Sequence, residues 1–315
     1  MRSWPTGSPR SCAQPRAPPR SLRARVPDPI SFFQAIVLGL LQGVSELFPI
    51  SSLGHSVVLP RAAGWNIHQD KHYFLTFLVA THLATALVLL WFFRNDWKRV
   101  VTGMWRSLQM REIRDDDIDA RLGWLLVVGT IPAGVIGLLL EKPIRSLFAS
   151  PRAAAVFLIF NGVMLYGAER LRRRASAPDD WKGDSDARIA GLSWRQSIGV
   201  GTAQVIALIP GFSRSGATMG GGLLAGLSNE DAARFSFLLA TPIIFAAAAL
   251  KLPELFGHQG DHVRAQALVG ALCAAVTAYL AVRFLLRFFR QNTLTPFAAW
   301  CVGIGIVLTI VFAID

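Results

Sequence analysis

Six apolar runs, each close to the length of a membrane-spanning helix, constrain this chain more than any other feature. They lie at about 74–93, 122–140, 153–169, 234–252, 265–283 and 294–314. A helix needs roughly 20 apolar residues to cross about 30 Å of hydrocarbon. Hydrophobic residues make up 52% of the chain and charged residues 17%, a balance that soluble domains rarely reach. The sequence therefore predicts an all-α polytopic membrane protein with about six transmembrane helices.

Two further apolar segments, 30–62 and 194–227, are interrupted by Pro, Gly, Ser and charged residues. Lipid cannot satisfy the backbone polar groups that such interruptions expose. A broken helix at membrane depth must therefore be buried in protein or line a wet cavity. We expect both segments to form re-entrant helical hairpins rather than simple spans.

The two interrupted segments belong to an internal repeat. "FLVAT" at 77–81 recurs as "FLLAT" at 237–241, and a second match aligns Pro49 with Pro210 and Ser52 with Ser213. Three apolar spans separate the two segments, so we expect them to enter the membrane from opposite sides. This predicts an inverted repeat, with halves of about 30–140 and 194–315 in one membrane domain, 30–315. In such folds the site lies near the midplane, where the discontinuous helices meet.

Charge is distributed as membrane topology predicts. The connections 94–121 and 170–195 carry seven Arg and Lys residues each, and the positive-inside rule makes both cytoplasmic. The net charge of +12 is therefore attributed to topology, and no nucleic-acid partner is expected. Residues 1–29 hold seven Pro and six Arg without an apolar core. They predict a disordered basic extension, or a translation start that in fact lies later, near Val26.

Polar residues of the two interrupted segments form one candidate site. "QGVSELFPISSLGH" at 42–55 contributes Gln42, Glu46, Ser51, Ser52 and His55, and "PGFSRSGAT" at 210–218 contributes Gly211, Ser213, Arg214 and Ser215. Gln42 and Glu46 are four residues apart and share a helix face. Pro49 ends that helix, so that Ser51 and Ser52 can cap a new one, whose N-terminus suits a phosphate. The glycines allow close backbone approach, and Arg214 can bind two phosphate oxygens.

These residue types predict phosphoryl transfer or hydrolysis. A Ser hydroxyl or an activated water attacks phosphorus while His or Glu handles the proton. Arg and helix N-termini stabilise the charge on the oxygens. Glu46 in the same cavity can hold Mg²⁺ or Ca²⁺. Charge inside a bilayer is costly, so Glu46 and Arg214 indicate function; a buried structural ion pair is the alternative.

The two quoted motifs resemble the signature motifs of the bacterial undecaprenyl-diphosphate phosphatases, also called bacitracin-resistance proteins. The resemblance covers nearly everything after residue 30. It implies removal of the terminal phosphate from undecaprenyl diphosphate, which recycles the carrier lipid for peptidoglycan synthesis and confers bacitracin resistance. It also implies a divalent cation and a site that opens to the outer side of the plasma (inner) membrane.

The resemblance extends to single residues. The family's second motif Glu falls on Glu46, its proposed nucleophilic Ser on Ser52, its His on His55 and its essential Arg on Arg214. Ser51 and Ser213 match supporting polar positions, and Ser215 and Gly211 join them as expected phosphate-binding residues. The chain departs from the pattern at Gln42, where Glu is frequent, and at Leu53, where Thr is frequent.

Several alternatives stay open at this point. Gln42 is neutral, so it is at most a weak metal ligand beside Glu46. A polyprenyl-phosphate transporter also fits an inverted repeat with a midplane site, although a set of Ser, His and Arg favours an enzyme. The sequence leaves open whether Ser52, His55 or water attacks phosphorus, which cation is bound, and whether the chain forms a homodimer.

Overall fold

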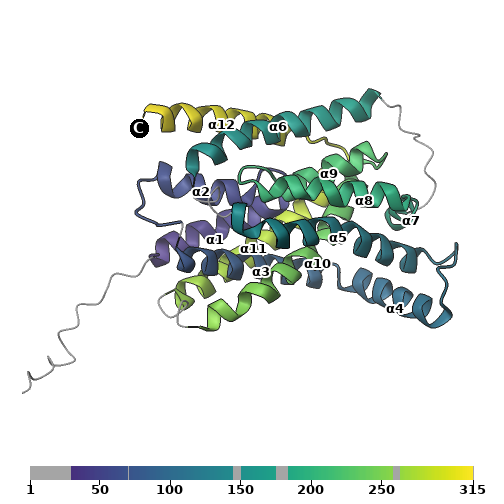
Figure 1. Ribbon diagram of the computed structural model, residues 1–315. Coiled ribbons are helices and arrows are strands. Elements are labelled where there is room, and N and C mark those ends of the chain that lie inside the picture. Colours follow the sequence, from purple (N-terminus) through teal and green to yellow (C-terminus); the bar gives the residue numbers. More distant parts are fainter. Residues whose placement is uncertain (1–29, 70, 145–149, 175–183, 258–262, 315) are drawn as a thin grey trace, which may run out of the picture.

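The structure, a computed structural model, describes residues 30–69, 71–144, 150–174, 184–257 and 263–314 (Figure 1). The predicted extension at 1–29 lies outside these residues. The first helices are α1 (Phe32–Leu47), α2 (Ser52–Ala62), α3 (His72–Phe92), α4 (Arg94–Met110), α5 (Ile118–Ile144) and α6 (Pro151–Arg174). They are followed by α7 (Ser185–Ala190), α8 (Trp194–Ala203), the 3-10 helix η3 (Gln204–Leu208), α9 (Arg214–Leu224), α10 (Asn229–Phe256), α11 (Arg264–Phe288) and α12 (Thr295–Ile314).

Six of the described helices are long and apolar enough to cross a membrane, namely α3, α5, α6, α10, α11 and α12. They coincide with the six apolar runs of the sequence, which confirms the prediction of an all-α polytopic membrane protein. The outer side of α11 shows what these helices face. Leu268, Leu272, Val276 and Leu280 follow one another at four-residue spacing and are each more than half exposed. Such a stripe is typical of a helix face that contacts lipid.

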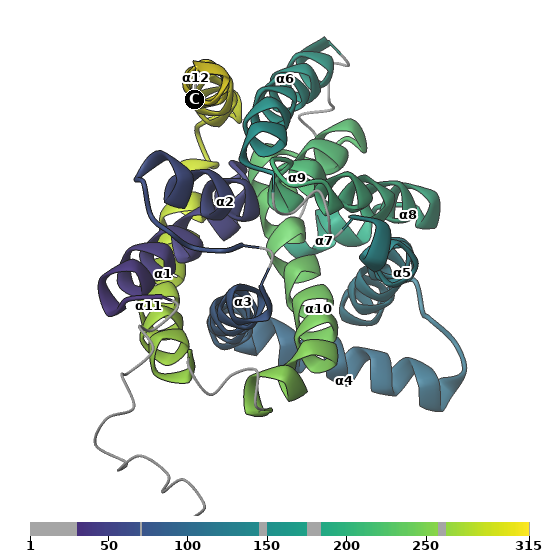
Figure 2. The same cartoon turned by 60° about the vertical axis from the view of Figure 1, so that its left-hand side comes forward.

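The long helices surround two short helices, α2 and α9, which contribute to the candidate site. The α6–α12 pair lies along one side, and α3 packs against α10 and α11 on the other (Figures 1 and 2). Phe74 and Phe77 of α3 and Phe235 and Phe237 of α10 are almost fully buried. Helices α2 and α9, each of which follows a break, lie between these two groups (Figure 2).

Each interrupted segment is a helix, a break and a second helix. The first break, 48–51, ends at Ser51, whose Oγ accepts a hydrogen bond of 3.1 Å from the Gly54 N–H and so caps α2. The second break, 209–213, ends at Ser213, whose Oγ caps α9 by accepting from the Gly216 N–H at 3.1 Å. Serine at an N-cap satisfies one of the free amides of the first turn. Whether these breaks are re-entrant within a bilayer stays a prediction.

The caps correct the alignment of the repeat. Helices α1 and α8 both open with a capping box, at Ser31 and Ser193, and these residues are 162 positions apart, as are the caps Ser51 and Ser213. By structural role Ser213 therefore matches Ser51 rather than Ser52. The reason is that the second break is one residue longer than the first. The inverted relation of the two halves stays a prediction.

The connection 94–121 differs from the loop that its charge suggested. Most of it forms α4, which follows α3 almost directly. Val101, Trp105 and Leu108 lie on one face of this helix and are each more than half exposed. An apolar face beside basic residues is typical of a helix that lies in the membrane interface.

A methyl group added at Gly39 should destabilise the fold, because α1 and α11 cross closely there. A Cβ at this position would lie 2.8 Å from the Cα of Gly270, nearer than two carbon atoms can approach. We expect Gly39→Ala to lower the free energy of unfolding by about 1–3 kcal/mol, the usual cost of overpacking. Thermal unfolding in detergent measures this. The control is Gly303→Ala in α12, where an added Cβ meets nothing within 4 Å. Equal stability of the two variants would contradict the close crossing.

Candidate functional site

The two interrupted segments meet at one cavity of about 340 Å³. Its polar lining comes from both segments and two long helices, and consists of Ser45, Glu46, Ser52, His82, Ser213, Arg214 and Lys251. The remaining lining is apolar and includes Leu75, Leu208, Phe212 and Ile243. The structure thus brings Glu46, Ser52, Ser213 and Arg214 of the predicted site together in one largely apolar cavity.

The Glu46 carboxylate is the centre of this polar lining. Arg214 donates from Nη2 to Oε1 at 3.0 Å. The other oxygen, Oε2, accepts from Ser52 Oγ at 2.6 Å and from Gln42 Nε2 at 3.1 Å, and His82 Nε2 lies 3.2 Å from it. The Glu46 side chain is only 4% exposed. A buried charge needs such pairing to be tolerated, and charge-assisted hydrogen bonds are the strong ones.

Arg214 is only partly satisfied by this contact. Its Nε and its second terminal nitrogen, Nη1, are buried and have no hydrogen-bond partner within the described part of the chain. Leaving buried donors unpaired is costly, so these two nitrogens are candidate donors to the oxygens of a ligand. Ser52 and Arg214 are also the first residues of α2 and α9. Two helix N-termini, both positive dipole ends, therefore reach the same cavity.

The remaining predicted phosphate-binding residues already have structural contacts. The hydroxyls of Ser51 and Ser213 are the N-caps of α2 and α9. Ser215 Oγ donates to the Phe48 carbonyl at 3.1 Å, which joins the two breaks directly. Gly211 has a φ of +103°, where a side chain is strained, and a Cβ there would lie 2.5 Å from the Ala154 carbonyl. A phosphate-binding role for these four residues stays a prediction.

The structure does not bring His55 to the Glu46 carboxylate. Its Nδ1 lies 2.8 Å from the Ser51 carbonyl, and its Nε2 lies 3.2 Å from the indole Nε1 of Trp300. A carbonyl only accepts and an indole only donates, so the ring is neutral with hydrogen on Nδ1. His55 is stacked on Trp300 and is absent from the described lining of the cavity. Its predicted catalytic role stays a prediction.

Sequence reasoning missed two residues of this region. His82 touches Glu46 from α3. The sequence could have indicated it, because an ionisable residue inside an apolar run is a functional candidate. Asn161 lies fully buried in α6. Its Nδ2 donates to the Pro49 carbonyl at 3.0 Å, and its Oδ1 accepts from the Ser213 N–H at 2.9 Å. One amide thus holds the two breaks against each other.

The groups around Glu46 do not fit a divalent cation held by the protein. Mg²⁺ and Ca²⁺ take six or more oxygen ligands. Glu46 is the one carboxylate in the described lining of the cavity, and both its oxygens already face N–H or O–H groups. Gln42 turns its amide nitrogen toward Glu46, and its Oε1 has no partner in the described structure. No cluster of three or more His, Cys, Asp or Glu occurs among the residues described.

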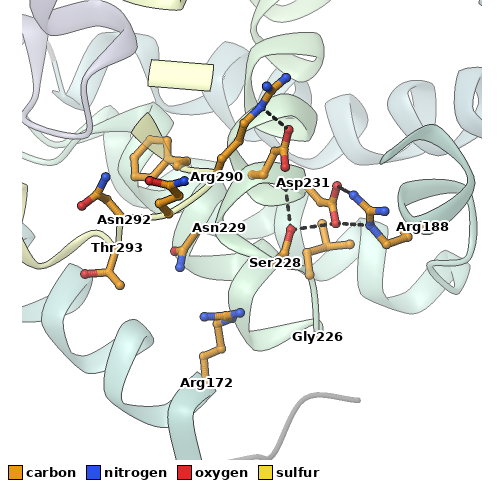
Figure 3. Close-up of a pocket in the computed structure, with 13 residues that line it drawn as sticks. Arg172, Arg188, Gly226, Ser228, Asn229, Asp231, Arg290, Asn292 and Thr293 are labelled. Carbon is orange, nitrogen blue, oxygen red and sulfur yellow. Dashed lines mark hydrogen bonds and ion pairs between the residues drawn. The ribbon is translucent and has the colours of Figure 1, made fainter. Parts of the chain in front are cut away.

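A second polar pocket, of about 450 Å³, lies at the other end of α10 (Figure 3). It contains several arginines, and two of them form close pairs with carboxylates of the protein. Arg188 Nε donates to Asp231 at 2.7 Å, and Arg290 Nε donates to Glu230 at 3.2 Å (Figure 3). These pairs connect α7 and the turn after α11 to the start of α10. We assign them a structural role.

Comparisons with known proteins show which family this chain resembles over most of its length. The model of the family described as bacitracin resistance protein BacA matches residues 35–307. An undecaprenyl-diphosphatase of Mycolicibacterium paratuberculosis is 50% identical, over 88% of this chain and 95% of its own length. Undecaprenyl-diphosphatase 2 of Burkholderia thailandensis is 47% identical, with 88% and 95% covered. Undecaprenyl-diphosphatase 2 of Frankia alni is 43% identical, with 90% and 99% covered.

Replacing Asn161 should destabilise the junction of the two breaks. Asn161→Leu keeps the volume but leaves the Pro49 carbonyl and the Ser213 amide without this partner. Each unpaired buried group costs about 1–3 kcal/mol, so we expect a clear fall in the thermal unfolding temperature in detergent. The control is Asn66→Leu on the exposed surface, which should change stability by no more than about 0.5 kcal/mol. An unchanged Asn161→Leu protein would show that the bridge is dispensable.

Proposed function

The chain belongs to the bacitracin resistance protein BacA family, and we propose that it hydrolyses undecaprenyl diphosphate to undecaprenyl phosphate and inorganic phosphate. One observation carries this proposal. Arg214 keeps two unpaired nitrogens beside a Ser52–Glu46 hydrogen bond of 2.6 Å. A cation with free donors, a hydroxyl and a base in one cavity are the groups that phosphoryl transfer needs.

The shape of the cavity supports a lipid diphosphate as substrate. Its polar lining includes Glu46, Ser52 and Arg214, whereas Leu75, Phe212 and neighbouring side chains make the rest apolar. A diphosphate head and the first part of a polyprenyl chain match these two regions. The remainder of a long chain lies in the bilayer, along helices whose outer faces are apolar.

In the proposed reaction Ser52 Oγ attacks the terminal phosphorus, and its proton passes to Glu46 Oε2. The bond between this phosphorus and the bridging oxygen breaks, and undecaprenyl phosphate leaves with that oxygen. Water then attacks the phosphoserine, which releases inorganic phosphate and restores the Ser52 hydroxyl. Arg214 and the N-termini of α2 and α9 stabilise the charge on the transferred oxygens. Direct attack by water, with Glu46 as the base, is the alternative.

We propose that the site opens to the outer side of the plasma membrane. The cavity is lined by Ala247, Ala248 and Lys251, in the second half of α10. At the start of the same helix Asp231 pairs with Arg188, which belongs to the basic segment 170–195. Positive segments face the cytoplasm. The cavity therefore lies toward the opposite end of α10, and the proposed role in peptidoglycan synthesis and bacitracin resistance rests on the family match.

Phosphate release tests the activity directly. The purified chain in detergent should release inorganic phosphate from undecaprenyl diphosphate, measured with and without EDTA. A transporter is distinguished with liposomes, in which the lipid would cross the bilayer without release of phosphate. That result would contradict the proposed hydrolase.

Replacing Arg214 should remove most of the activity. Arg214→Ala deletes the donors aimed at the phosphate, and the loss of such a group costs at least about a hundredfold in turnover. Arg214→Lys keeps a charge but not the planar fork, so intermediate activity is expected. Arg290→Ala, at an exposed ion pair in the second pocket, serves as the control and should turn over normally. Near-normal turnover of Arg214→Ala would refute this mechanism.

Replacing Ser52 should distinguish the two nucleophiles. If Ser52 attacks, Ser52→Ala loses at least about a hundredfold in turnover. A labelled terminal phosphate should then be trapped on the wild-type protein by acid quenching, and not on the variant. Ser56→Ala is the matched control, because Ser56 lies one turn further along α2 with a buried hydroxyl that has no described partner. An active Ser52→Ala variant would show that water attacks directly.

A further inference from the structure

His82 touches the Glu46 carboxylate and lies outside both motifs. It lies in the middle of α3, and its Nδ1 is 2.7 Å from the Leu78 carbonyl. A carbonyl only accepts, so Nδ1 carries hydrogen. Its Nε2 lies 3.2 Å from Glu46 Oε2, and a bare nitrogen would repel a carboxylate oxygen at this distance. Nε2 therefore also carries hydrogen, and the ring is an imidazolium ion.

This charge changes the balance around Glu46. The groups that touch the carboxylate are the cations His82 and Arg214, the hydroxyl of Ser52 and the neutral amide of Gln42. Together with Glu46 they carry a net charge of one positive unit. A second carboxylate in place of Gln42 would bring this net charge to zero, whereas the present set attracts an anionic diphosphate by itself.

The orientation of Glu46 also depends on His82. Arg214 holds Oε1, while Ser52, Gln42 and His82 converge on Oε2. The contacts from Ser52 and Gln42 come from neighbouring parts of the same segment. The contact from His82 comes from a different helix, α3, so it fixes the carboxylate relative to the long helices.

We propose that His82 is a positioning residue, which holds the Glu46 carboxylate against Ser52 and which, with Arg214, takes the place of a divalent cation at this carboxylate. The part that concerns turnover rests on the proposed function, and the part that concerns cation binding does not. Any cation that the reaction uses then enters with the diphosphate rather than on Glu46.

The first experiment measures Ca²⁺ binding to the substrate-free protein, as a rise in unfolding temperature in detergent. A rise in unfolding temperature that disappears in the Glu46→Gln variant is caused by Ca²⁺ binding at this site. We expect the wild-type protein to show no Glu46-dependent rise. The double variant Gln42→Glu/His82→Gln places two carboxylates together without the imidazolium, and it should show a rise that a further Glu46→Gln change removes. A Glu46-dependent rise in wild type, or its absence in the double variant, would overturn the proposal.

The second experiment measures turnover of undecaprenyl diphosphate by single variants. His82→Ala removes both the hydrogen bond and the charge, and kcat should fall by at least about tenfold. His82→Gln keeps a donor without the charge and should recover part of kcat, while KM stays raised because the attraction to the diphosphate is lost. The control is His72→Gln, at the exposed start of α3. Wild-type kcat and KM in His82→Ala would overturn the positioning role, whereas an inactive wild type would contradict only the proposed function.

Discussion

A single buried carboxylate, that of Glu46, sets the conditions that the rest of this structure has to meet. A charge at membrane depth is costly, and one left without partners destabilises a protein by several kcal/mol. Here the partners come from four helices: Gln42 from α1 itself, Ser52 from α2, His82 from α3 and Arg214 from α9. Three of these helices follow one another in the chain, but Arg214 is 168 residues from Glu46, so the carboxylate is fully compensated only when α9 packs against the first three helices.

The breaks in the two interrupted segments make this compensation possible. Ser51 adopts a φ of 72°, which is uncommon for a residue with a side chain and marks strain held by the surrounding contacts. Asn161 and the bond between Ser215 and the Phe48 carbonyl hold the two breaks together. The residues that follow the two caps, Ser52 and Arg214, then occupy equivalent places. The same local structure thus presents a hydroxyl in one half and a cation in the other.

The sequence predicted those parts of the molecule that depend on local pattern. Apolar length identified the six spanning helices, and the interruptions located Glu46, Ser52 and Arg214. It failed where packing between distant segments decides. The partner of His55 is Trp300, in another helix, and no local sequence pattern predicts that contact. His82 and Asn161 act across helix interfaces in the same way. Helix α4 was missed because its charge suggested a loop, and Ser213 was aligned with Ser52 because the second break is longer by one residue.

The contacts of Arg214 favour a functional site over a purely structural ion pair. A pair kept for stability alone would satisfy its donors, because each unpaired buried group costs about 1–3 kcal/mol. Nη2 of Arg214 donates to Glu46, whereas Nε and Nη1 have no partner in the described structure. Phosphate oxygens are the groups that match such a fork. In the proposed reaction the oxygens of the diphosphate would pair with these donors, while the contact from Nη2 keeps the Glu46 carboxylate in place beside Ser52.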